Sequence, residues 1–137
     1  REKILAADIL ILGGPVWMGQ LGSVAKRVLE RMDALISETD DSGRMPTYGK
    51  VAVAAIVGNE DGAHMSSAQC YQALSDVGFT IPPLAVSYWV GEAMGSVDFK
   101  DLDPVPDKVL QTAGMVADNA AHVARLLKAT PFPGHAS

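Results

Sequence analysis

The sequence predicts an α/β protein whose parallel sheet is covered by helices on both faces. Two short segments, residues 9–12 and 51–57, are apolar throughout rather than at alternate positions, which is typical of strands buried on both faces. A third strand is predicted over residues 84–90. Each of these segments is followed by a longer stretch with helical periodicity. This alternation indicates parallel strands joined by right-handed crossovers. We therefore expect ligands to bind beyond the carboxyl ends of the strands.

The beginning of the chain predicts a helix that leads directly into the first strand. Residues 1–7 read as the last turns of a helix, and residues 8–12 form an apolar strand that ends at Gly13, Gly14 and Pro15. Because domains seldom begin within a helix, we expect residues 1–137 to be a single domain that lacks its N-terminal part.

The next elements follow from periodicity and capping. A helix is predicted from Ser23, which can cap it, and a polar surface loop over residues 38–49. Residues 51–57 predict the second strand and residues 63–77 the next helix, which Gly78 ends as a left-handed cap. The apolar positions expected to face the core are Val24, Val28, Leu29, Met32, Leu35 and Ile36 in the first helix, and Ala68, Ala73, Leu74 and Val77 in the second.

The remaining chain predicts a third strand over residues 84–90, a loop over residues 91–106 and a last helix over residues 107–128. Pro131 and Pro133 end that helix. Its expected core positions are Val109, Ala113, Val116, Ala117, Ala120, Val123, Ala124 and Leu127.

The composition fits one domain with a single core. Of the 137 residues, 48% are hydrophobic, which argues against a disordered chain. The 11 Lys and Arg against 16 Asp and Glu give a net charge of −5, which argues against a nucleic-acid partner. The single cysteine, Cys70, forms no disulfide framework and fits a reducing compartment. With no apolar run long enough to span a membrane and no leader, we expect a cytoplasmic protein.

The loop after the first strand carries the strongest functional signal. Its glycines allow the backbone to approach a ligand closely, and Pro15 stiffens the exit from the strand. Trp17 and Met18 offer an aromatic face and a thioether suited to a flat ring. The alternative, that both side chains pack onto the neighbouring helix, is equally compatible with the spacing.

The loop after the second strand places Asn59, Glu60 and Asp61 before a helix. Backbone N–H groups at such a position bind carbonyl or anionic atoms, although a helix cap with a solvated acidic turn explains the same residues. A metal site formed by Glu60, Asp61 and His64 lacks any recognised ligand spacing, and none is predicted.

No nucleophile or phosphate-loop motif is present. Cys70 lies within a helix and is expected to be an inert, packed thiol. Tyr88 and Trp89 end the third strand, either as a hydrophobic seal or as part of a ring-binding wall. No catalytic residue is assigned, and His64 and Tyr88 are the nearest acid–base candidates by position. These features indicate that a cofactor carries the chemistry.

Residues 7–33 resemble the central motif of the flavodoxin-like NAD(P)H-dependent FMN reductase family, whose relatives include the WrbA-type quinone reductases. Residues 57–64 and 88–95 resemble the next two strand-end loops of that family. The positions that carry the first motif are Gly14, Pro15, Trp17, Gly19, Lys26 and Asp33.

The resemblance implies a flavodoxin-like three-layer fold that lacks its first strand–helix units, and FMN bound at the strand ends. One side of the flavin ring would be lined by Pro15, Val16, Trp17, Met18 and Gly19. The pyrimidine edge of the ring would meet the backbone of Gly58, Asn59, Glu60, Asp61 and Gly62.

The resemblance further implies hydride transfer from NAD(P)H to FMN and then to a quinone, a flavin or another small-molecule electron acceptor, in a protein that forms homo-oligomers. Two alternatives stay open at this point. One is an electron-transfer flavoprotein without nicotinamide turnover, and the other is a non-catalytic flavodoxin-like module for oligomerisation.

Overall fold

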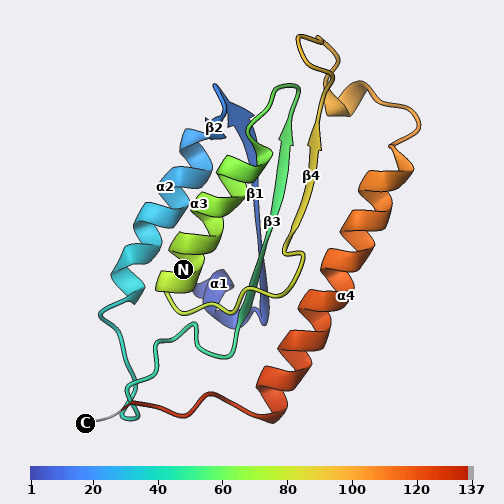
Figure 1. Cartoon of the computed structure of the whole chain (residues 1–137). Coiled ribbons are helices and arrows are strands. Elements are labelled where there is room, and N and C mark those ends of the chain that lie inside the picture. The colour runs from blue at the N-terminus through green and yellow to red at the C-terminus, as the bar shows by residue number, and fades with distance from the viewer. Residues whose placement is uncertain (136–137) are drawn as a thin grey trace.

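The computed structural model describes residues 1–135 and has three layers, with a sheet between two layers of helices (Figure 1). The sheet has the strand order β2-β1-β3-β4. Its parallel strands are β1 (Ile9–Trp17), β3 (Val51–Gly58) and β4 (Val86–Val90), and the short β2 (Gln20–Leu21) runs antiparallel to the end of β1. The predicted α/β fold class is confirmed.

Helices cover both faces of this sheet. On one face lie α2 (Ser23–Met32) and α3 (Ala63–Asp76), and on the other lies α4 (Asp107–Ala129) (Figure 1). The short helix α1 (Glu2–Ala6) precedes β1, and two 3₁₀ turns, Asp33–Leu35 and Phe99–Asp101, lie in the connections. No helix among residues 1–135 combines the length and apolar character needed to cross a membrane.

The parallel register brings three strand ends together. Pro15 pairs with Val57, which in turn pairs with Trp89. The carboxyl ends of β1, β3 and β4 therefore meet at one end of the molecule, where the arrowheads point in Figure 1. The predicted strand-end loops begin there.

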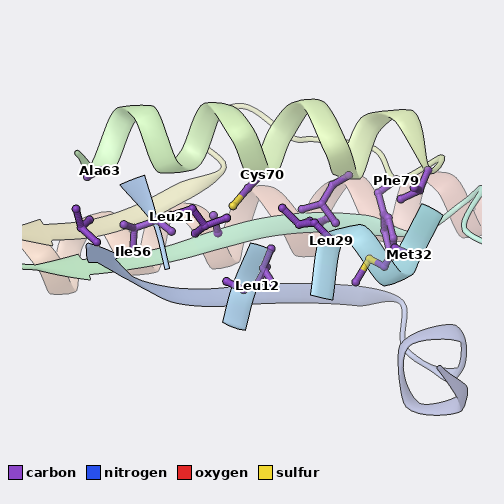
Figure 2. Close-up of a cluster of buried hydrophobic side chains, with 14 of the residues drawn as sticks. Leu12, Leu21, Leu29, Met32, Ile56, Ala63, Cys70 and Phe79 are labelled. Atoms are coloured by element: carbon purple, nitrogen blue, oxygen red, sulfur yellow. The ribbon is translucent and has the colours of Figure 1, made fainter. Parts of the chain in front are cut away.

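The larger part of the core lies between the sheet and the helices α2 and α3. Figure 2 shows Leu12, Ile56 and Cys70, from β1, β3 and α3, pointing into this layer. The buried hydroxyl of Thr47 donates a hydrogen bond to the carbonyl oxygen of Val77 and fixes the loop that precedes β3 to the end of α3. A second cluster joins the sheet to α4 through Val51, Val53, Ala85, Val116, Ala120 and Ala124.

One edge of the sheet is open among the described residues. The amide of Val51 donates to the carbonyl of Asp8 at 3.0 Å, so along β1 the even-numbered residues turn their backbone polar groups toward β3. The odd-numbered residues from Ile9 to Gly13 turn theirs outward, where no strand of the described chain pairs with them. The side chain of Ile11 is 66% exposed on this edge.

The first strand is longer than predicted, because β1 continues through Gly13 and Gly14 to Trp17. Both glycines pair with β3, opposite Ala55 and Ile56. Pro15 is tolerated because its ring nitrogen faces the side of β1 away from β3, where no ladder hydrogen bond is needed. Pro15, Val16 and Trp17 therefore stand in a strand, whereas the sequence analysis placed them in a loop.

The first predicted helix differs in its start and in its buried face. Ser23 is its first residue and makes no capping hydrogen bond, while Gly22 occupies the cap position. Val24 is 76% exposed, and Val28 and Ile36 are also exposed. The physical reason is that α2 contacts the sheet and α3 along only one side, through Ala25, Leu29 and Met32.

Smaller corrections concern the second half of the chain. The strand expected from residue 84 begins at Val86, because Leu84 has a positive φ of 53° that no strand accommodates. The expected core positions Ala68, Ala113 and Ala117 are exposed. Gly78 has a φ of 96° just beyond α3, which confirms the predicted left-handed cap.

Candidate functional site

The residues 17–19 form the tip of a hairpin between β1 and β2. Met18 and Gly19 have φ values of 53° and 72°, the pair of positive values that a tight two-residue hairpin turn requires. Trp17 is 66% exposed and Met18 is 90% exposed. The alternative in which these two side chains pack onto the neighbouring helix is therefore wrong, and both are available to a ligand.

The β3–α3 loop, residues 59–62, lies directly against this hairpin. The Glu60 Oε1 accepts a hydrogen bond from the Met18 amide at 2.9 Å. A Cβ atom built on Gly62 would lie 2.7 Å from the backbone of Gly19. The backbones of the loop and of the hairpin tip therefore approach each other as closely as glycine allows. The structure thus brings together the two loops that the sequence analysis selected.

Three backbone donors are free in the β3–α3 loop. Within residues 1–135, the amide groups of Asn59, Glu60 and Asp61 donate no hydrogen bond, whereas the Gly62 amide donates to Asp61 Oδ1 at 2.7 Å. The free groups lie between the carboxyl end of β3 and the first turn of α3. Successive N–H donors in such a place bind carbonyl or anionic atoms.

A third segment, which the sequence analysis assigned to a plain loop, also reaches this site. The Asn59 side-chain amide donates a hydrogen bond to Asp98 Oδ1 at 3.0 Å. The ring of Phe99 lies against that of Trp89, with centroids 5.6 Å apart. Phe99 is the single aromatic residue of residues 91–106, and this lone aromatic side chain was the signal available in the sequence.

These elements line an open cavity of about 310 Å³ at the carboxyl end of the sheet. Pro15, Val57 and Trp89 point to the same face because they pair in register. Trp17 lines the cavity from β1, and Phe99 and Lys100 line it from the segment that follows β4. The cavity is therefore lined by three aromatic rings, which come from β1, from β4 and from the segment that follows β4.

The acid–base candidates of the sequence analysis meet on the other face of the sheet. The rings of His64 and Tyr88 pack edge to face, with centroids 5.1 Å apart. Cys70 is fully buried, and burial raises the pKa of its thiol to about 11. It is therefore protonated at neutral pH and matches the inert thiol predicted. No group of three or more His, Cys, Asp or Glu among residues 1–135 is arranged to hold a metal ion.

Comparison with protein families gives a match over residues 1–94 to the family described as NADPH-dependent FMN reductase. The 8-demethyl-8-aminoriboflavin-5'-phosphate synthase of Streptomyces davaonensis is 32% identical over 134 residues, which are 96% of this chain and 51% of that protein. A protein named divalent metal cation transporter MntH, from Mycobacterium bovis, is 35% identical over 131 residues, which are 93% of this chain but 19% of that protein.

Among solved structures, RosB with bound 8-demethyl-8-formylriboflavin-5'-phosphate matches with a TM-score of 0.84 and 32% identity. The match covers 96% of this chain and 52% of the RosB chain. It confirms the predicted flavodoxin-like fold. The chain spans about half the length of RosB and of the Streptomyces synthase, and a fifth of the Mycobacterium protein.

Proposed function

This chain belongs to the NADPH-dependent FMN reductase family, and from that premise we propose that it serves as an FMN-dependent oxidoreductase. In the proposed reaction, NAD(P)H is the hydride donor, and a quinone, a free flavin or another small molecule is the final electron acceptor. The proposal concerns the whole protein, because the chain spans only part of the length of its relatives.

The observation that carries the proposal is the set of free amide groups of Asn59, Glu60 and Asp61, in a loop whose first residue, Asn59, lines the same cavity as Trp17. The pyrimidine edge of a flavin ring presents carbonyl oxygens and a ring nitrogen, which accept hydrogen bonds from backbone N–H groups. The rest of the ring is flat and apolar and fits against an exposed tryptophan. The donor set and the aromatic surface therefore fit FMN.

In this proposal the residues of the chain bind and orient the ring, while FMN supplies the two-electron chemistry when bound. Trp17 and Met18 cover part of the ring and exclude water from it. Glu60 holds the hairpin tip at a fixed position through its hydrogen bond to the Met18 amide, so that the aromatic surface is preorganised before the cofactor binds.

A second candidate function treats the flavin as a substrate. The Streptomyces relative is named as a synthase of an aminoriboflavin phosphate, and the RosB structure holds a formylriboflavin phosphate. The 32% identity of RosB across 96% of this chain favours an enzyme that modifies flavins over an enzyme whose reaction involves no flavin.

Absorption spectroscopy of the purified protein separates these functions. We expect a flavin band that survives desalting after incubation with FMN and that NADH or NADPH bleaches without oxygen. A band that neither donor bleaches would contradict the reductase proposal. Mass spectrometry of the released flavin would then show whether the ring had been modified, as the second candidate requires.

A matched pair of variants ties this binding to the proposed site. Trp17→Ala is expected to weaken FMN binding by about fivefold or more, because it removes an exposed ring-binding surface. Phe132→Ala is the control. Phe132 is a partly exposed aromatic residue near the C-terminus that packs on Tyr48 and does not line the cavity. Equal FMN affinities of the two variants would remove Trp17 from the site.

We also propose that the protein is a cytoplasmic homo-oligomer. The family to which the chain belongs supports this proposal. In residues 1–135 taken alone, the edge of β1 that has no partner strand is where a second copy of this chain would pair.

A further inference from the structure

We propose that residues 98–100 belong to the flavin site, and that Asp98 is a positioning residue for the loop that carries the free amide groups. This inference deepens the proposed function and rests on it. The segment lies beyond residues 1–94, where the match to the family ends, so the family resemblance assigns it no role.

The contact that anchors the loop is the hydrogen bond from Asn59 Nδ2 to Asp98 Oδ1 at 3.0 Å, which is partly buried. Because the Asn59 side chain is held by Asp98, the backbone amide of Asn59 keeps a fixed direction while remaining free to bind a ligand. The anchor therefore orients the donors without competing for them.

A backbone contact supports the same side of the loop. The Gly91 amide donates to the Gly58 carbonyl at 3.1 Å, and a Cβ atom on Gly91 would lie 3.1 Å from the Cα of Asn59. On the opposite side, Glu60 holds the hairpin tip. The loop is thus held both by the hairpin tip after β1 and by the segment after β4, and a loop ordered in advance loses less conformational entropy when a ligand binds.

Residues 98–100 also line the cavity at the carboxyl end of the sheet. The Phe99 ring packs on Trp89 at an interplanar angle of 48°, and both rings line the cavity of about 310 Å³ that Trp17 lines from β1. A cavity lined by these aromatic rings and by Asn59, whose backbone amide is free, fits a flat heteroaromatic ring such as isoalloxazine.

The charge of Asp98 has a minor part in this arrangement. Its ion pair with Lys100, at 3.5 Å, joins side chains that are 49% and 75% exposed, and exposed pairs of this kind contribute little. The proposal therefore assigns the effect to the acceptor oxygen of Asp98. An amide at this position keeps an acceptor oxygen for Asn59 and removes the charge.

FMN titrations of the whole protein, monitored by the quenching of FMN fluorescence, test the proposal. Asp98→Ala is expected to weaken FMN binding about five- to tenfold. Asp98→Asn is expected to bind FMN like the wild type, and so is the control Asp118→Ala, which removes an exposed aspartate of α4 away from the cavity. Asn59→Asp alone should weaken binding, because it places two carboxylates together. The double variant N59D/D98N should restore binding, because the hydrogen bond re-forms with donor and acceptor exchanged.

A readout without FMN accompanies the titrations. Amide hydrogen exchange of residues 59–61 is expected to be faster in Asp98→Ala and to return to the wild-type rate in the double variant. Wild-type affinity and exchange in Asp98→Ala, or failure of the double variant to recover either, would overturn the inference. If the whole protein in its wild-type form binds no FMN, the proposed function is refuted and the inference with it, which is a distinct result.

Discussion

Replacing Gly62 with alanine is expected to separate the two loops of the candidate site. Gly62 has a φ of 135°, and a Cβ atom there would lie 2.7 Å from the Cα, carbonyl carbon and carbonyl oxygen of Gly19. All three are backbone atoms, so no side chain can rotate away from the new methyl group. The hairpin tip and the β3–α3 loop must move apart instead.

The size of the effect follows from two separate costs. A non-glycine residue at such a φ costs about 1–3 kcal/mol of backbone strain. Inserting a methyl group into a closed contact costs about 1–3 kcal/mol more. The reduced entropy of the unfolded chain returns roughly 0.4–1 kcal/mol. We therefore expect Gly62→Ala to lower the free energy of unfolding by about 3 kcal/mol, and to weaken FMN binding as the donors and Trp17 move apart.

Gly49→Ala is the matched control. Gly49 also has a positive φ, of 84°, but a Cβ atom there meets nothing within 4 Å, so only backbone strain applies, at about 1 kcal/mol. Urea denaturation followed by circular dichroism measures both variants, and FMN titration compares the sites. If Gly62→Ala is no less stable than Gly49→Ala and binds FMN equally well, the close packing of the two loops is not what holds the site.

Three further predictions concern the rest of the fold. Burial raises the pKa of the Cys70 thiol from 9.0 to about 11, so the unfolded chain releases this proton at a lower pH and the free energy of unfolding falls as the pH rises through that interval. Urea denaturation at several pH values should show a shallower fall in Cys70→Ala than in the wild type, and equal slopes in the two proteins would contradict the shift. Thr47→Val removes the buried hydrogen bond to the Val77 carbonyl and should cost about 1–3 kcal/mol in the same assay, whereas a neutral result would mean that this carbonyl finds another donor. Ile11→Lys places a charge on the open edge of β1 and should shift sedimentation toward monomer, whereas Val24→Lys, at an exposed position on α2, should not; unchanged association in both variants would rule out this edge as the contact.

Much of the fold was readable from local patterns. Strands that are apolar at every position, such as residues 51–57, have to be buried on both faces, and helices follow them at regular spacing. Gly78 ended a helix as predicted, because few residues other than glycine adopt its positive φ at low cost.

The errors arose where a tertiary contact overrode a local signal. Gly13 and Gly14 are typical of a turn, yet the ladder with β3 carries both of them into β1. Val24 and Val28 continue the apolar stripe of α2, but among residues 1–135 that helix has neighbours on only one side. Hydrophobic periodicity shows which face of a helix can be buried, and the packing partners decide how much of that face is buried.

The candidate site divides in the same way. The sequence by itself determined its residue types, with a tryptophan, a methionine and glycine-rich turns where buried strands end, because these residues are neighbours in the chain. Only the tertiary structure decided that Glu60 holds Met18 and that Asp98 holds Asn59. Those pairs lie 42 and 39 residues apart, and the order of strands in the sheet, which no local pattern contains, brings them within hydrogen-bond distance.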